Sequence, residues 1–293
     1  MTESRIAVLG AGIMGSPMAR NLARAGFGTI VWNRSPAARA ALADAGVQAA
    51  PSPAEAVRGA AIVLTMLPTA DVVTSVVLDS GLLDAFERNA IWAQMGTLGI
   101  AETERIAARV RETRPDIRFV DAPVSGSKGP AERGQLVILA SGPRDAQPVL
   151  ERPFAAMGRK TVWLGEAGQG TRMKIVLNAY MAILVEGAAE ALELASRFGI
   201  GHAELQQALA GGPLEAPIVA AKMQKMVAGD YAPEFPLVWA LKDVDLALAA
   251  AGPNPPPLVA ALSPSWHATV NAGHGREDVS AARLGLGPAA KSS

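Results

Sequence analysis

A glycine-rich turn between a short apolar run and a helical pattern constrains this chain more than any other feature. Residues 5–9 have the length and apolar character of a buried strand, and the sequence GAGIMG at residues 10–15 follows them directly. Residues 16–25 then carry apolar side chains at helical spacing. A strand, the pattern G-x-G-x-x-G and a helix in this order predict a turn that binds the pyrophosphate of a dinucleotide.

Each glycine of this turn has a distinct physical role. Gly10 permits the tight turn, Gly12 lets a pyrophosphate approach the backbone, and Gly15 lets the helix pack closely on the strand. The phosphate charge would meet free backbone amides and the positive end of the helix dipole. Because Ile13 and Met14 belong to the same turn, we predict that they contact the cofactor as well.

The end of the next predicted strand indicates which dinucleotide is used. Residues 29–32 read as a strand, and Asn33, Arg34 and Ser35 follow, where an NAD-selective site usually has an acid for the ribose hydroxyls. Arg34 offers the charge and the planar fork that suit a ribose 2′-phosphate. The sequence therefore predicts NADP(H) with these three residues in the site, and NAD(H) remains open as the alternative.

Strand-like and helical segments continue to alternate through the first half of the chain. This alternation predicts a Rossmann-type α/β domain over residues 1–165, with a doubly wound, mostly parallel sheet. Further strands are expected at residues 61–67, 90–95, 117–122, 136–140 and 161–164, with helices through Leu78 and over about 101–113.

Several short motifs follow directly after these predicted strands. In parallel sheets, ligands bind outside the carboxyl ends of the strands, so we expect the motifs to converge on one crevice. They are Met66-Leu67-Pro68, Gly96-Thr97 and Ser125-Gly126.

An apolar segment without proline runs from Gly168 to about Phe198, and it predicts one long helix joining two domains. At 100° per residue, Lys174 and Asn178 fall on one line with apolar residues further along the helix. A lysine on such a face either reaches the surface or occupies a cleft that holds a partner for its charge. The acids of the same helix fall on another sector, which we predict to face water; they are Glu186, Glu190 and Glu193.

Beyond the long helix no strand-like run recurs. The pattern predicts an all-α domain over residues 166–293 that serves substrate binding and oligomerisation, with the long helix beside a cleft between the two domains. Lys174 and Asn178 would then face the nicotinamide end of the dinucleotide. Helical spacing is found at about 202–210, 214–228, 236–251, 257–272 and 279–285.

Composition excludes several other classes of function. The chain has 27 basic and 27 acidic residues and no charge run, which argues against nucleic-acid or membrane-surface binding. Without cysteine, neither disulfides nor thiolate chemistry can matter. His202, His267 and His274 lack metal-ligand spacing and lie far in sequence from the strand-end motifs, so we expect no metal site. With no signal-peptide pattern, a cytoplasmic location is expected.

Taken together, these motifs resemble the β-hydroxyacid dehydrogenase family, in the group related to 3-hydroxyisobutyrate dehydrogenase. Four patches match in order across nearly the whole length of the chain. They are the turn at residues 10–15, DAPVSG at 121–126, the motif at 168–178, and Lys242-Asp243 after Phe235-Pro236-Leu237. Within the family, the region 125–136 is similar to the glyoxylate and succinic semialdehyde reductases, whereas 3-hydroxyisobutyrate dehydrogenases tend to carry another glycine where Ser127 stands.

The resemblance implies roles for individual residues. Lys174 would be the catalytic lysine and Asn178 its positioning partner. Substrate contacts would come from Ser125, Gly126, Thr97, Phe235 and Asp243, and cofactor contacts from Met66, Leu67, Pro68, Thr97 and Lys242 in addition to the glycine turn and the 33–35 segment.

Two departures from the family pattern affect the expected substrate. Gly96 stands where a serine usually precedes Thr97, and Val238-Trp239 replaces a more polar pair ahead of Lys242. The resemblance implies reversible, NADPH-dependent reduction of a small carboxylate-bearing aldehyde. A 3-hydroxyisobutyrate or other β-hydroxyacid dehydrogenase, an imine reductase, and a dinucleotide-binding scaffold without activity remain alternatives. The apolar helical half predicts self-association, and relatives usually form dimers or tetramers.

Overall fold

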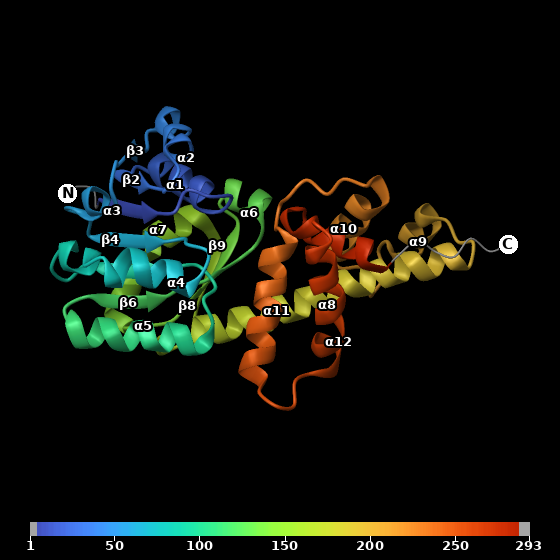
Figure 1. Cartoon of the computed structure of the whole chain (residues 1–293). Coiled ribbons are helices and arrows are strands. Elements are labelled where there is room, and N and C mark those ends of the chain that lie inside the picture. The colour runs from blue at the N-terminus through green and yellow to red at the C-terminus, as the bar shows by residue number, and fades with distance from the viewer. Residues whose placement is uncertain (1–4, 287–293) are drawn as a thin grey trace. The chain divides into compact units, whose positions relative to one another are not determined.

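The computed structural model describes residues 5–286 and divides into two compact units, Met1–Lys174 and Ile175–Ser293. The division falls inside one long helix, α8 (Gln169–Arg197), which is drawn in yellow-green to yellow in Figure 1. This helix confirms the prediction made for residues 168–198. The domain boundary predicted from the sequence, between residues 165 and 166, lies just before it.

A parallel sheet of six strands forms the centre of the first unit, in the order β3-β2-β1-β4-β5-β6. The chain starts in the middle at β1, fills one side, and then crosses to β4 and fills the other side. The strand order therefore reverses between β1 and β4, which is where ligands bind in sheets of this type. The strands are β1 (Ile6–Leu9), β2 (Thr29–Trp32), β3 (Gln48–Ala49), β4 (Ile62–Thr65), β5 (Ile91–Gln94) and β6 (Arg118–Asp121).

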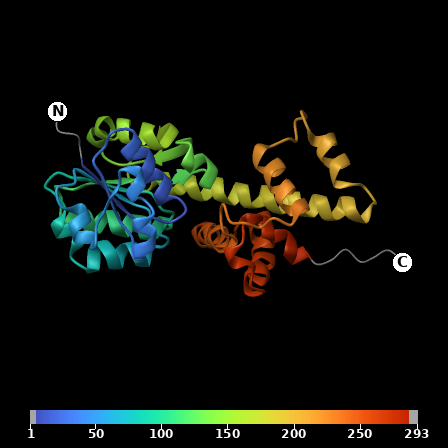
Figure 2. The ribbon, with the colours of Figure 1, turned by 90° about the horizontal axis from the view of Figure 1, so that it is seen from above.

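Helices cover both faces of this sheet (Figure 2). Alternate residues of β1 point to opposite faces, so Ile6 and Val8 pack with α1 and α7, while Ala7 and Leu9 pack with α3 and α5. The predicted helix ending at Leu78 is α4, and it continues into a π-helical turn at Thr74–Asp79. The helices of this unit are α1 (Gly15–Arg24), α2 (Pro36–Ala40), α3 (Pro53–Val57), α4 (Ala70–Val73), α5 (Ile100–Thr113), α6 (Lys128–Glu132) and α7 (Gln147–Met157).

The last three strands of the first unit form a separate sheet in the order β7-β8-β9. They are β7 (Val124–Ser125), β8 (Leu136–Ala140) and β9 (Gly158–Trp163), and β7 runs antiparallel to β8. The strands predicted at residues 136–140 and 161–164 are therefore present, but they do not continue the main sheet. An apolar run shows that a strand is buried and does not show which sheet it joins.

The second unit is all-helical within the described residues. Its core joins the buried side of α8, including Val185 and Leu192, to residues of α10, α11 and α12. By length and composition α8 could cross a membrane, but these buried residues make it a core helix of this unit. The helices after α8 are α9 (His202–Leu209), α10 (Pro217–Ala228), α11 (Leu237–Ala251) and α12 (Pro257–Asn271), and a 3-10 segment spans Val279–Leu286.

The prediction that the acids of α8 face water is wrong for Glu186. This residue is buried, with 7% of its surface exposed, and its Oε2 accepts a hydrogen bond of 2.6 Å from Nε1 of Trp266. Burial raises the pKa of Glu186, the bond from Trp266 opposes that shift, and the charge of Glu190 adds to it. Glu190 is exposed as predicted, whereas Glu193 is half-buried, with 13% of its side-chain surface exposed.

Candidate active site

The glycine turn after β1 has two positions, Gly10 and Gly15, where a larger residue would clash with the backbone. Gly10 has φ +110°, and a Cβ there would lie 2.3 Å from the carbonyl oxygen of Met66. A Cβ on Gly15 would lie 1.8 Å from the carbonyl oxygen of Gly10, so the helix can pack on the strand only without one. Gly12 is exposed and a Cβ there would meet nothing within 4 Å. The turn thus offers open backbone ahead of a helix N-terminus, which fits a dinucleotide pyrophosphate.

Asn33 is tied to this turn by its side chain. Its Oδ1 accepts a hydrogen bond of 3.0 Å from the backbone nitrogen of Ala11. The carbonyl oxygen of Asn33 in turn accepts from Arg39 at 3.2 Å, and the same guanidinium nitrogen reaches the carbonyl oxygen of Pro51. Arg34 and Ser35 are exposed beside them. Asn33 therefore holds the glycine turn, a contribution that strand-end position alone could not reveal, and Arg39 is a supporting residue that no sequence motif predicts.

The loops after β4 and β5 approach each other closely. A Cβ on Gly96 would lie 2.6 Å from the carbonyl oxygen of Leu67, so the serine usual in the family has no room here. Gln94 fixes this loop, because its Nε2 donates to the carbonyl oxygen of Gly96 at 2.8 Å and its Oε1 accepts from Oγ1 of Thr65 at 2.8 Å. Glycine at position 96 therefore brings two strand-end loops together and removes a hydroxyl next to Thr97.

Four groups of predicted site residues in the first unit thus lie along the carboxyl edge of the main sheet. The order across this edge is Asn33, the glycine turn, Met66-Leu67 and Gly96-Thr97, each near its neighbour. Ser125 and Gly126 belong instead to the three-stranded sheet, at the end of β7 and directly after it; Ser125 is half-buried and Gly126 exposed, with φ +130°. Their contact with substrate stays a prediction.

Lys174 and Asn178 lie one helical turn apart on α8. Both are buried, with 9% and 6% of their surfaces exposed. Nδ2 of Asn178 donates to Oδ2 of Asp243, which is itself 3% exposed. Nζ of Lys242 lies 2.9 Å from Oδ1 of the same carboxylate. Asp243 therefore holds the side-chain amide of Asn178 and is itself paired with Lys242.

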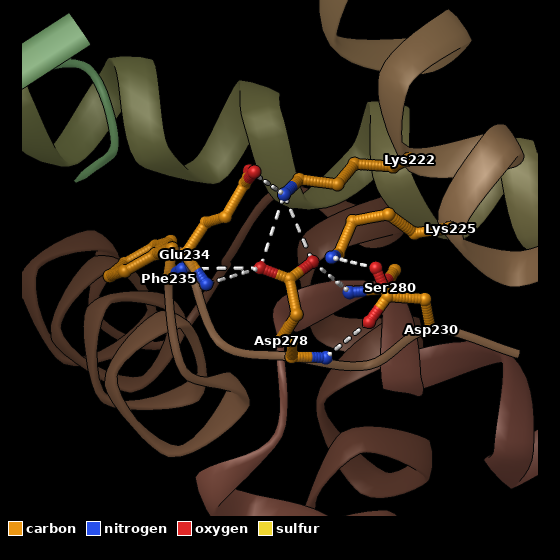
Figure 3. A network of polar contacts seen from close by, with 8 residues as sticks. Lys222, Lys225, Asp230, Glu234, Phe235, Asp278 and Ser280 are labelled. Carbon is orange, nitrogen blue, oxygen red and sulfur yellow. Dashed lines mark hydrogen bonds and ion pairs between the residues drawn. The ribbon is translucent and has the colours of Figure 1, made fainter. Parts of the chain in front are cut away.

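A buried ion pair holds the segment that contains Phe235 (Figure 3). Nζ of Lys222 lies 2.9 Å from Oδ1 of Asp278, and these residues are 2% and 0% exposed. Oδ2 of Asp278 accepts from the backbone nitrogens of Glu234 and Phe235, each at 3.1 Å. The half-buried Phe235 is therefore fixed just before α11, the helix that carries Lys242 and Asp243.

Comparison with known proteins identifies the chain. The sequence model for the NAD binding domain of 6-phosphogluconate dehydrogenase matches residues 5–165. A second model, for the NAD-binding region of NADP-dependent 3-hydroxyisobutyrate dehydrogenase, matches residues 168–284. The chain belongs to the β-hydroxyacid dehydrogenase family. It is an NAD(P)-dependent oxidoreductase that acts on CH–OH groups.

Three relatives illustrate the range of this family. Glyoxylate/succinic semialdehyde reductase 1 of Arabidopsis thaliana is 33% identical over 279 residues, which cover 94% of this dehydrogenase and 96% of the relative. Cytokine-like nuclear factor N-PAC of Homo sapiens is 32% identical over 89% of this chain and 48% of its own length. The solved 3-hydroxyisobutyrate dehydrogenase of Salmonella typhimurium has a TM-score of 0.88 at 28% identity, covering 96% of this chain and 99% of that one.

Proposed function

We propose that this dehydrogenase uses NADPH to reduce a small aldehyde that bears a carboxylate, of the glyoxylate or succinic semialdehyde type, to the hydroxyacid, and that the reaction is reversible. The observation that carries the proposal is the buried residue Lys174 one turn from Asn178 on α8, in a chain whose glycine turn at residues 10–15 fits a dinucleotide. The reductase name of the Arabidopsis relative supports the substrate class.

The chemistry divides between the bound nicotinamide and the side chains of this chain. When bound, the nicotinamide supplies the hydride for the carbonyl carbon. The Lys174 ammonium stabilises the negative charge that grows on the carbonyl oxygen and donates the proton that completes the alcohol. In the oxidation direction the same amine accepts that proton. Asn178 contributes an uncharged amide that can hydrogen-bond to the substrate or to Lys174, and Asp243 holds that amide in place.

Recognition of the substrate carboxylate falls to residues of the predicted strand-end motifs. A hydroxyl donor at Ser125, the exposed backbone at Gly126 and the hydroxyl of Thr97 are suited to carboxylate oxygens. With Gly96 in place of serine, the carboxylate has one hydroxyl fewer available to it. Phe235 and Asp243 complete the substrate end in this proposal, and Lys242 with Met66-Leu67-Pro68 contributes to cofactor binding.

The preference for NADPH rests on Arg34. Its exposed guanidinium after β2 provides a cation where an NAD-selective site carries an acid. A 2′-phosphate would gain a charge-assisted hydrogen bond there, whereas an unmodified ribose would not.

A second candidate is oxidation of 3-hydroxyisobutyrate or another β-hydroxyacid. It is favoured by the match to the 3-hydroxyisobutyrate dehydrogenase model over residues 168–284. An imine reductase or a scaffold without activity is disfavoured, because imine reductases and inactive relatives usually lack a lysine at the position of Lys174. Assembly as a homodimer or homotetramer and a cytoplasmic location stay predictions.

A substrate panel with NADPH and NADH in parallel tests the proposal. It contains glyoxylate, succinic semialdehyde, a cyclic imine and, in the oxidation direction, 3-hydroxyisobutyrate. The highest kcat/KM is expected for a carboxylate-bearing aldehyde with NADPH. Turnover confined to 3-hydroxyisobutyrate would favour the second candidate, and nucleotide binding without any turnover would favour a scaffold.

A further inference from the structure

The last residue of β6, Asp121, lies where the two sheets of the first unit meet. It is fully buried. Its backbone nitrogen donates to the carbonyl oxygen of Ser141 at 2.9 Å, and the nitrogen of Ser141 donates back at 2.7 Å. Because Ser141 directly follows β8, this pair joins the main sheet to the three-stranded sheet.

The side chains at this junction hold the first turn of α8. Oδ2 of Asp121 accepts from the backbone nitrogen of Thr171 at 2.7 Å, and its Oδ1 accepts from Oγ1 of Thr171 at 2.7 Å. Oγ of Ser141 accepts from the nitrogen of Gly170 at 2.9 Å and lies 3.2 Å from Oδ2 of Asp121, to which it can donate. Two amides that a helix start leaves without intrahelical partners are thus bonded by residues of the two sheets.

Backbone packing allows little adjustment at this junction. A Cβ on Gly170 would lie 2.2 Å from the carbonyl oxygen of Leu139 and 2.9 Å from that of Asp121. Thr171 is fully buried against them. The start of α8 is therefore held directly against the ends of β6 and β8. The side-chain bonds of Asp121, Thr171 and Ser141 fix the position of the first helical turn there.

Lys174 follows Thr171 by three residues, a rise of about 4.5 Å along the helix. We infer that Asp121, acting through Thr171 and Ser141, is the positioning residue that fixes the lysine-bearing turn of α8 to the carboxyl edge of the sheet. The inference rests on the proposed function, since it concerns the placement of the proposed proton donor. A misplacement of about 1 Å at a reacting group costs on the order of a hundredfold in rate, so this junction has a large effect on turnover.

The test uses two threonine-to-valine variants that each remove one buried hydroxyl. Thr171→Val removes the hydroxyl bonded to Asp121. Thr29→Val is the matched control. Thr29 is 3% exposed, and its hydroxyl donates to the carbonyl oxygen of Phe27 at 3.0 Å. It lies at the start of β2, on the side of the sheet where the strands begin, away from the carboxyl edge.

For Thr171→Val, kcat is expected to fall by at least about tenfold, while KM for the aldehyde and Kd for NADPH stay within about twofold. Thr29→Val should keep kcat within about twofold of the unmodified protein. The conservative variant Thr171→Ser, which retains the hydroxyl, should recover most of kcat. In the cofactor-free protein, hydrogen exchange of residues 168–175 should be faster in Thr171→Val than in Thr29→Val.

Equal kcat and equal exchange in the two valine variants would overturn the inference. If Thr171→Val does not fold, Ser141→Ala takes its place: it removes the acceptor of the Gly170 amide and should lower kcat without raising KM. A Lys174→Ala variant measured in parallel distinguishes a failure of the inference from a failure of the proposed function. Normal turnover of Lys174→Ala would overturn the proposed function and the inference together, whereas its inactivity beside a normal Thr171→Val would overturn the inference alone.

Discussion

Replacing Lys222 by methionine should destabilise the second unit strongly, because it leaves Asp278 buried without its cation. The two side chains lie 2.9 Å apart at 2% and 0% exposure, and breaking such a buried pair costs about 3–5 kcal/mol. Lys225→Met is the matched control on the same helix: its pair with Asp230 at 3.1 Å is at the surface, where such pairs contribute little to stability. Figure 3 shows both pairs.

Urea denaturation measures the difference between these variants. Lys222→Met should lower the midpoint by at least about 1 M, and Lys225→Met should leave it nearly unchanged. The double variant Lys222→Met/Asp278→Asn should recover more than half of the loss, because no buried unpaired charge remains; Glu234, the other partner of Lys222, has 45% of its side chain exposed to water. Equal midpoints for the two single variants would refute the reasoning.

The difference in the free energy of unfolding between the unmodified protein and Lys222→Met should depend on pH. Burial alone would raise the pKa of Asp278, but the charge of Lys222 and the hydrogen bonds from Lys222, Phe235 and Ser280 outweigh it and hold the pKa below its usual value. A lowered pKa contributes stability that is present above the unfolded value of about 3.9 and is lost as the pH falls through the folded value. The difference in the free energy of unfolding between the unmodified protein and Lys222→Met should therefore be widest at neutral pH and should narrow in acid, as Asp278 becomes protonated.

Two further predictions concern charge elsewhere in the chain. Burial raises the pKa of Glu186, so its contribution to stability is present below the unfolded pKa and is lost as the pH rises through the folded value. Glu186→Gln should accordingly raise the free energy of unfolding at pH 7 and leave it nearly unchanged near pH 3; urea denaturation at the two pH values checks this, and a lower free energy of unfolding at pH 7 would contradict it. Arg34→Ala should raise KM for NADPH about tenfold and leave KM for NADH unchanged in steady-state assays, and equal effects on both cofactors would contradict the assigned 2′-phosphate contact.

Much of the fold follows from signals that are local in sequence. The GAGIMG turn and its flanking periods predict β1 and α1, and the uninterrupted apolar segment ending before Gly199 predicts α8 within a residue or so at each end. Helical spacing also locates α9 through α12. These elements can be predicted because each depends on the spacing of apolar residues and glycines within one segment of the chain.

What the sequence could not show depends on partners far along the chain. Glu186 lies on the polar sector of a helical wheel, yet Trp266, 80 residues later, supplies the hydrogen bond that lets it be buried. Asp121 was visible only as part of a motif, and its bonds to Thr171, 50 residues later, emerge from the packing of two sheets against α8. Likewise, β8 has the same apolar pattern whichever sheet it joins.

Candidate site residues divide in the same way. Gly10 and Gly15 perform the roles predicted for them, since the turn and the close packing are backbone properties that the motif encodes. The cofactor contact of Asn33 stays a prediction, and the structure adds a bond that the motif did not predict, from the backbone nitrogen of Ala11 to its side chain. A residue type at a strand end indicates proximity to the site and does not determine which group its side chain bonds.

The central claim is that the amine of Lys174 supplies and accepts the proton during hydride transfer. Single-turnover reduction of the best carboxylate-bearing aldehyde by Lys174→Ala, with NADPH binding measured on the same sample, tests it most directly. We expect the rate to fall by about 10² to 10⁴ while Kd for NADPH changes less than about threefold. A rate close to that of the unmodified protein, with the cofactor bound normally, would contradict the claim.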